Sequence, residues 1–350
     1  GSIAVGVGAL YTQAIGSDAY SYNTAVGFQS GYTNSTGTGN TWLGYQAGYG
    51  GTGNNSNNVG LGYNALLSVT TGSSNTAVGS FAGDAITSTT NCTLVGYAAG
   101  GAINHTDATG TVCVGLNAGK AITSGQANTA IGTSALEDSI DSDYSTAVGY
   151  AALANQAGTA GTVANTGIGS FSLGSITTGT HNIGLGSNTL YTATTALRNV
   201  AIGFNAMTDT KAATAVADCV AIGYEALKGN SSTTSTNVNG TVAIGKDALK
   251  LCVTGTQNTA IGFQAADGLT TGGYNTFVGY QVADGGTITG DENTAVGVTA
   301  LQALTDGGQN TALGVRAGLV MATGDKNVFI GKDAADSATA CSSVIAIGHD

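Results

Sequence analysis

The chain has 350 residues, of which 57 are glycine and none is proline. Only 8% of the residues are charged and 42% are hydrophobic, which excludes an all-helical protein and argues against a disordered polymer. The net charge of −11 argues against nucleic acid as a partner. No uninterrupted run of about 18 apolar residues occurs, so we expect no insertion into a membrane.

One short motif recurs along the whole chain, and each copy predicts one structural element. Its consensus is Asn-Thr-Ala-Val/Ile-Gly-x-x-Ala, and its glycine, numbered position 0 here, occurs in twenty copies that are most often 17 residues apart. The copies span residues 1–350 as a single continuous repeat array. The motif glycines are Gly6, Gly27, Gly44, Gly62, Gly79, Gly96, Gly115, Gly132, Gly149, Gly169, Gly186, Gly203, Gly223, Gly245, Gly262, Gly279, Gly297, Gly314, Gly331 and Gly348.

The three residues before each glycine are predicted to form a short strand, at 3–5, 24–26, 41–43 and onward to 345–347. Position −3 is β-branched in every copy and position −1 is Val, Ile or Leu. Position −2 is never polar and is most often Ala. Both faces of the strand are therefore expected to be buried. No charge occurs from position −4 to position 0, so the variable remainder of each repeat is expected to meet water.

Two further positions are predicted to be structural. Asparagines at position −4 are expected to stack into an amide ladder, and the motif glycine is expected to supply a positive-φ corner or a close backbone approach. The ladder asparagines are Asn23, Asn40, Asn58, Asn75, Asn128, Asn165, Asn182, Asn199, Asn258, Asn275, Asn293, Asn310 and Asn327. The glycines that we single out are Gly27, Gly44, Gly62, Gly79, Gly132, Gly149, Gly262, Gly279, Gly314 and Gly331.

The repeat predicts an all-β fold, a parallel β-solenoid or β-roll with about one coil per 17-residue unit. Nineteen intervals at the spacing of β-strands would extend roughly 90 Å. An outward apolar stripe at position −2 would be an aggregation hazard in a monomer, so we infer a homotrimer that hides it. No polar capping repeat is visible at either end, and we expect the array to be part of a longer fibre.

The units at 258–265, 40–48 and 310–314 resemble the shaft repeats of phage and viral tail-fibre proteins, which often carry an endosialidase-type chaperone domain. They are also similar to the head repeats of trimeric autotransporter adhesins. The resemblance covers essentially the whole chain and implies a left-handed parallel β-roll built as a homotrimer. The 17-residue unit is longer than the adhesin unit, and we expect neither a membrane anchor nor the chaperone domain within these 350 residues.

The chain offers little that predicts catalysis. His105, His181 and His349 occupy different positions of different repeats, so no catalytic residue, cofactor or metal ligand is predicted. The five cysteines are expected to be small buried apolar residues. Glu137, Asp138, Asp141 and Asp143 form the densest carboxylate group, which is expected to be a solvated loop, with Ca²⁺ binding as the alternative.

An aromatic row follows the motif glycine, and it is expected to serve packing, with stacking on sugars as the alternative. The row consists of Phe28, Tyr45, Tyr63, Tyr97, Tyr150, Phe204, Tyr224, Phe263 and Tyr280.

The leading functional hypothesis is a non-enzymatic shaft of an extracellular fibre, a virion tail-fibre component that supports host attachment. One alternative is a trimeric bacterial surface adhesin that binds host matrix or glycan through its rod, and another is a fibre-borne polysaccharide depolymerase. Partners would be further copies of the chain and a cell-surface glycan or protein receptor. Insertions in the long units that end at Gly27, Gly169, Gly223 and Gly245, notably residues 230–240, are predicted to be contact points.

Overall fold

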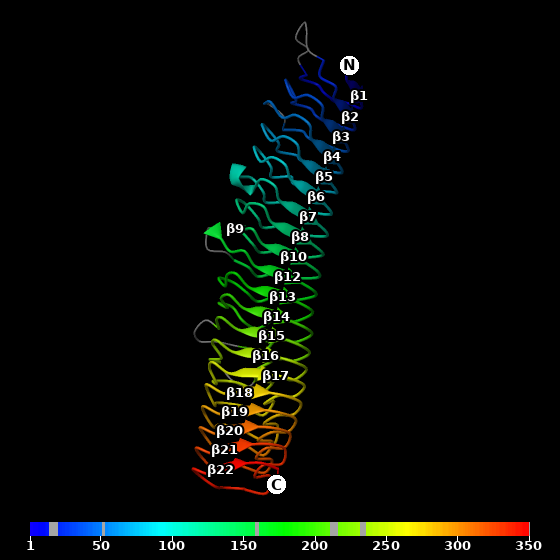
Figure 1. The fold of residues 1–350 in the computed structure, drawn as a ribbon. Helices are drawn as coiled ribbons and strands as arrows, with labels where there is room; N and C mark the ends of the chain where they lie inside the picture. Colours follow the sequence, from blue (N-terminus) through cyan, green and yellow to red (C-terminus); the bar gives the residue numbers. More distant parts are fainter. Residues whose placement is uncertain (14–19, 51–52, 158–160, 211–215, 232–235, 350) are drawn as a thin grey trace. The chain divides into compact units, whose positions relative to one another are not determined.

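A computed structural model describes residues 1–13, 20–50, 53–157, 161–210, 216–231 and 236–349 of the chain. The chain divides into two compact units, Gly1–Thr178 and Gly179–Asp350. Each unit is built from short parallel strands that follow one another in chain order (Figure 1). The residues outside the description include 14–19, 158–160, 211–215 and 232–235, which belong to the four long repeats, so the predicted contact loops lie partly outside it.

The unit Gly1–Thr178 carries one motif strand in each repeat, a short 3₁₀ helix, η1 (Thr106–Ala108), and a small separate pair formed by β9 and β11. Its strands are β1 (Ile3–Val5), β2 (Thr24–Val26), β3 (Thr41–Leu43), β4 (Val59–Leu61), β5 (Thr76–Val78), β6 (Thr93–Val95), β7 (Val112–Val114), β8 (Thr129–Ile131), β9 (Ser142–Asp143), β10 (Thr146–Val148), β11 (Gly161–Thr162) and β12 (Thr166–Ile168).

The unit Gly179–Asp350 repeats the same arrangement. Its strands are β13 (Ile183–Leu185), β14 (Val200–Ile202), β15 (Val220–Ile222), β16 (Val242–Ile244), β17 (Thr259–Ile261), β18 (Thr276–Val278), β19 (Thr294–Val296), β20 (Thr311–Leu313), β21 (Val328–Ile330) and β22 (Ile345–Ile347).

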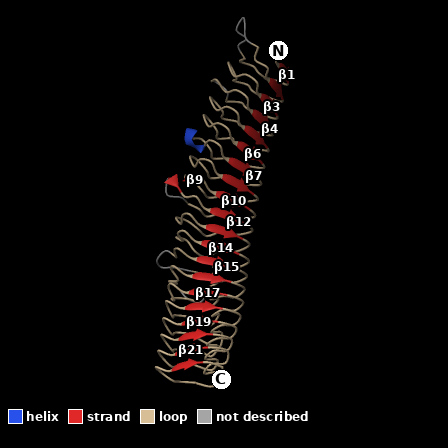
Figure 2. Cartoon of the chain, viewed as in Figure 1, coloured by secondary structure: helices blue, strands red, loops and turns tan. Residues whose placement is uncertain are grey.

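The motif strands of each unit pair in parallel and in the register of the repeat. Thr24 pairs with Thr41 and Ala25 with Trp42, for example, so equivalent residues of successive repeats lie side by side. Turns and loops make up almost all of the remaining chain (Figure 2). The fold is therefore a parallel β-solenoid, with one coil per repeat of about 17 residues, as the sequence predicts. No helix in the described part of the chain is long and apolar enough to cross a membrane.

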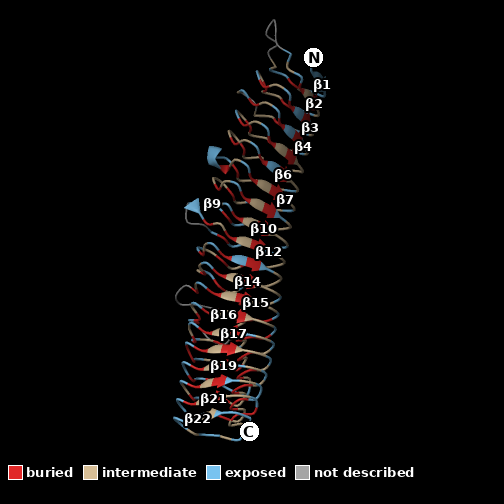
Figure 3. Cartoon of the chain, in the orientation of Figure 1, coloured by how far each residue is buried: buried red, intermediate tan, exposed pale blue. Residues whose placement is uncertain are grey.

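Buried residues recur along both units, in the motif strands and in the turns (Figure 3). Position −2 is fully buried at Ala25, Trp42 and Phe277, for example. Its bulky members are accommodated by glycines in contact with them, since a Cβ on Gly60 would lie only 2.8 Å from the Trp42 ring. Small and large side chains thus compensate one another inside the coil, which is how a solenoid interior keeps protein packing density.

The expectation that both faces of the strand are buried within the protein is wrong for a single chain. The side chains at positions −3 and −1 point outward, and Leu43 and Leu185 remain 44% and 45% exposed. The position −2 stripe, which would be an aggregation hazard if it faced outward, lies inside the coil, so it gives no reason for a trimer. Alternation of side chains along a strand allows only one of the two sets to face the interior.

Candidate functional site

The position −4 asparagines form a buried column in each unit, and none of the thirteen is more than 1% exposed. The Asn23 Oδ1 atom accepts the Asn40 main-chain N–H at 2.8 Å, and the Asn23 Nδ2 group donates to the Gly37 carbonyl at 2.7 Å. Direct amide–amide bonds occur at several steps, such as 3.0 Å from Asn199 Nδ2 to Asn182 Oδ1. Each side chain therefore ties its own coil to the backbone of the next coil.

Cysteine replaces asparagine in two of the coils. Cys219 still donates its main-chain N–H to Asn199 Oδ1 at 2.9 Å, and its Sγ atom lies 3.1 Å from the Val238 carbonyl oxygen. Burial raises the pKa of the Cys219 thiol to about 11 and that of the Cys92 thiol likewise to about 11. These thiols are therefore protonated and unreactive at neutral pH. Cys92, Cys113, Cys219 and Cys252 are buried, and Cys341 is partly exposed.

The motif glycines form a second column, beside the strand ends. All ten of the glycines singled out from the sequence have φ between +129° and +149°. A Cβ atom on any of them would collide with the carbonyl of the motif glycine in the following coil. Both reasons for glycine, the backbone conformation and the close approach of two coils, therefore act at the same residue.

A third column, at position −6, was missed in the sequence. Asp291 Oδ1 accepts the Gly273 N–H at 2.7 Å, and Asp325 Oδ1 accepts the Gly308 N–H at 2.8 Å. Asp143 makes the same bond to Gln126 at 2.9 Å. The signal in the sequence was a short polar side chain, Asp, Asn or Ser, placed six residues before the motif glycine, but it varies too much between repeats to stand out.

The outward face of each strand carries two columns of apolar or β-branched side chains, at positions −3 and −1. We refer to these columns as the sheet face. Val, Ile and Leu at position −1 keep more than a third of their surface exposed in many coils, including Ile131, Ile261 and Leu313. A contiguous apolar surface of this kind marks an interaction site in soluble proteins.

The aromatic row runs beside the sheet face at position +1. Phe28 stacks on Tyr45 with ring centroids 5.3 Å apart, and Tyr45 stacks on Tyr63 at 5.0 Å. Lys246, which interrupts the row, lies over the rings of Tyr224 and Phe263 at 5.8 and 5.1 Å. All nine rings of the row remain exposed in the single chain. The row is therefore continuous where aromatic residues are adjacent, and its surface is free to contact another molecule.

Charged side chains on the outer turns pair with each other between coils. Glu225 binds Lys228 at 3.1 Å and Lys250 at 2.7 Å, so one buried carboxylate connects two lysines. Asp333 contacts Arg316 and Lys332, and these cations hold the pKa of the Asp333 carboxyl well below its usual range. The pairs made by Lys250 and Arg316 join turns of neighbouring coils, and Lys228 and Lys250 are among the residues that line a hollow of about 220 Å³.

Two of the histidines pair with aspartates at separate places in the described part of the chain. His105 caps η1 and contacts Asp107 at 3.3 Å, whereas His349 lies 3.7 Å from Asp333. No group of three or more His, Cys, Asp or Glu side chains among the described residues could hold a metal ion. In the carboxylate group at 137–143, Glu137 accepts a hydrogen bond from Asn117 at 3.1 Å, so its carboxylate serves contacts between coils.

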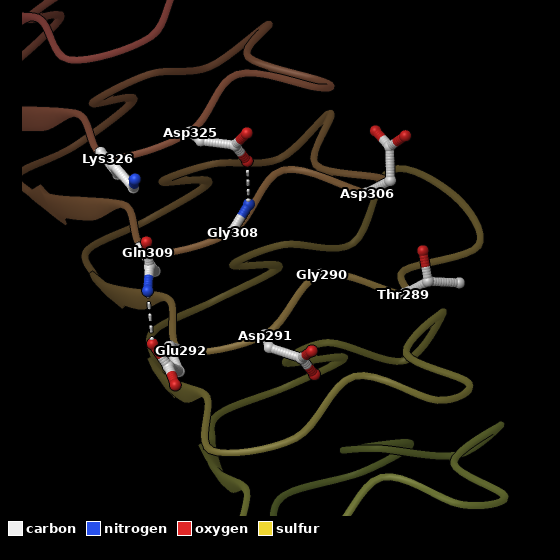
Figure 4. Close-up of a pocket in the computed structure, with 9 residues that line it drawn as sticks. All are labelled: Thr289, Gly290, Asp291, Glu292, Asp306, Gly308, Gln309, Asp325 and Lys326. Carbon is white, nitrogen blue, oxygen red and sulfur yellow. Dashed lines mark hydrogen bonds between the residues drawn. The ribbon is translucent and has the colours of Figure 1, made fainter.

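A shallow acidic hollow of about 350 Å³ lies in the unit Gly179–Asp350 (Figure 4). Asp291, Glu292, Asp306 and Asp325 line it, with Lys326 at its margin. Figure 4 shows the Asp325 bond to the Gly308 N–H and the 2.8 Å bond from Gln309 Nε2 to Glu292. Three of the four carboxylates therefore connect coils, which accounts for the cluster without a ligand.

No protein-family model matches this chain, and no curated protein sequence matches it. The geometry of the described residues is therefore the evidence from which a function can be proposed. Its most distinctive features are the sheet face and the aromatic row beside it.

Proposed function

We propose that this chain is the non-enzymatic structural shaft of an extracellular fibre of the phage or viral tail-fibre type. Three copies associate through the sheet face, and the left-handed winding implied by the resemblance is part of the proposal. The observation that carries it is the apolar column at position −1, which is Val, Ile or Leu in every coil and is exposed in ten of the twenty coils. A surface of this length is costly in water and is covered most economically by identical copies around a common axis.

The shaft role is mechanical. Each coil adds main-chain hydrogen bonds along the strand ladder, two more through its asparagine, and further apolar surface for contact between copies. Length and stiffness therefore grow with the number of repeats. A virion tail fibre outside the cell needs these properties to hold a receptor-binding tip away from the particle during host attachment.

The oligomeric state tests this proposal. Light scattering on the purified chain is expected to give three times the chain mass of 34.1 kDa. The double variant Ile261→Asp, Leu313→Asp places charges on the sheet face and is expected to yield monomers. Thr271→Asp, at an exposed bend outside the sheet face, is the control and should remain trimeric. A folded wild-type monomer would contradict the proposal.

An oligosaccharide-release assay on bacterial surface polysaccharides separates the shaft from a fibre-borne depolymerase. We expect no release above the level of a heat-treated sample. Reproducible release by the wild-type chain would overturn the non-enzymatic assignment.

A further inference from the structure

A groove of about 360 Å³ opens on the unit Gly1–Thr178 beside the aromatic row. Tyr97 and Phe81 form one wall, and Asp84 and Lys120 lie among the lining residues. Its volume is at the lower end of the range for small-molecule sites, roughly 300–1,000 Å³. The groove therefore has room for a ligand of the size of one or two sugar rings.

A gap in one column of side chains creates this groove. Asp84, Gly101 and Lys120 all occupy position +5, in three successive coils, and the middle one has no side chain. A Cβ atom on Gly101 would lie 3.4 Å from Asp84 Oδ1, so any larger side chain would enter the gap. The carboxylate and the ammonium group thus come from coils two strand spacings apart, roughly 10 Å.

The wall of the groove is an aromatic surface. Tyr97 is 54% exposed and meets Phe81 edge to face, with ring centroids 5.8 Å apart. Ala98 and Ala102 add further small apolar surface to the lining. The other lining residues lie at positions +2, +5 and +6 of three successive coils, whereas the sheet face is formed by positions −3 and −1. The groove and the sheet face therefore use different residues.

We propose that the groove binds one pyranose ring of a neutral glycan. The exposed face of Tyr97 suits the C–H face of a pyranose, as aromatic faces suit apolar surfaces with polar edges. The two oxygens of the Asp84 carboxylate accept hydrogen bonds from adjacent sugar hydroxyls, and the Lys120 ammonium donates to a hydroxyl or ring oxygen. The groove has a negative group at one end and a positive group at the other, which fits a ligand that is polar but uncharged.

The charges around the groove argue against other ligands. A phosphate or a polyanion would meet the Asp84 carboxylate and the chain's net charge of −11. A metal ion would find a single carboxylate in the groove, and none of the described residues forms a cluster suited to one. A neutral sugar would contact the aromatic wall, the carboxylate and the ammonium group of the groove.

Saturation-transfer NMR on the purified chain tests the proposal, with the methyl pyranosides of glucose, galactose, mannose and N-acetylglucosamine as probes. We expect transfer to at least one of them, strongest at the ring protons of one face. Tyr97→Ala removes the wall and Gly101→Leu fills the gap, and both are expected to weaken binding at least tenfold. Gly101 has no positive φ, so leucine is compatible with its backbone.

Two matched variants are the controls. Tyr150→Ala alters another row residue that meets a phenylalanine edge to face, at 5.1 Å from Phe171. Ala154→Leu enlarges position +5 in a coil that does not border the groove. Both should bind like wild type, and circular dichroism should show the same fold for all four variants.

Absence of transfer to every neutral probe would overturn the proposal, as would equal loss of binding in the two control variants. Glucuronic acid is added as an acidic probe, and transfer to it alone would also overturn the proposal, because the groove would then select an acidic ligand. The proposal goes beyond the shaft role and does not depend on it. The light-scattering mass reports the failure of the trimer separately, since sugar binding by a monomer would leave the groove assignment intact.

Discussion

Asn310 donates two hydrogen bonds to one oxygen of Asn293 in the preceding coil. The Asn310 main-chain N–H donates to Asn293 Oδ1 at 3.0 Å, and Asn310 Nδ2 donates to that atom at 3.1 Å. Asn310 Oδ1 in turn accepts two bonds from Asn327 in the following coil, from its main-chain N–H at 3.0 Å and from its Nδ2 group at 2.8 Å. A single side chain thus belongs to three coils at once, which makes the column a series of coupled steps.

Asn310→Ala should destabilise the unit Gly179–Asp350. The substitution leaves the Asn327 N–H and the Gly324 carbonyl without their buried partner, at about 1–3 kcal/mol for each unpaired group. Denaturant unfolding followed by circular dichroism measures the change. Asn104→Ala, at an exposed asparagine outside the column, is the control and should change stability by less than about 0.5 kcal/mol. Equal losses of stability in the two variants would contradict a structural role of the column.

Gly279→Ala should destabilise the protein more than an ordinary glycine substitution. Gly279 has φ of +149°, and a Cβ atom there would collide with the Gly297 carbonyl. The backbone strain alone costs of order 1–3 kcal/mol, to which the collision adds. Gly286→Ala is the control, because the nearest atom to its Cβ would be Thr305 Cγ2 at 3.9 Å. The measurement is the melting temperature of both variants. A Gly279→Ala protein with the melting temperature of wild type would refute the close-approach argument.

Cys219→Asn should stabilise the protein by about 1 kcal/mol, because it restores the column. The Cys219 Sγ atom already lies 3.1 Å from the Val238 carbonyl, where an asparagine Nδ2 group would form a stronger hydrogen bond. The measurement is the denaturant midpoint relative to wild type. Cys219→Ala, which keeps the main-chain bond to Asn199 and removes the side-chain donor, serves as the comparison and should be less stable than wild type. A Cys219→Asn protein no more stable than Cys219→Ala would contradict the prediction.

Stability should fall as the pH rises from about 4 to 7 because of one carboxyl pair. Burial, a hydrogen bond to Asp267 and the charge of Asp267 raise the pKa of Asp284 to about 7, from 3.8. The folded state therefore holds a proton that the unfolded state releases, so the stabilisation is complete below pH 4 and is lost through pH 7. Asp333 has the opposite shift, and its contribution changes only below pH 4.

The test compares denaturant midpoints of wild type and Asp284→Asn at pH 5 and pH 8. The difference between the two pH values should be smaller in the variant, because asparagine does not titrate. Asp138→Asn, at a carboxyl outside this pair, should retain the wild-type difference. An unchanged difference in Asp284→Asn would show that the pair does not govern this range.

The repeat by itself determined the positions of the strands, the columns and the coil. A residue that recurs every 17 positions must occupy the same place in every coil, so Asn293 and Asn310 had to be neighbours once a solenoid was inferred. The strand at Thr24–Val26 followed likewise from its β-branched pair. The absence of charge near the glycine separated the sheet from the outer turns. These features depend only on the period of the repeat, which can be read directly from the sequence.

Only the tertiary structure decided which side of each strand faces inward and where the gaps between columns lie. Ala25 and Val26 are both apolar, so hydrophobicity could not choose between them, and the space within a coil selected position −2. The groove at Gly101 depends on the side chains of the coils before and after it, Asp84 and Lys120. Contacts of this kind depend on which different residues neighbouring repeats place side by side, and the consensus of the repeat does not contain that information.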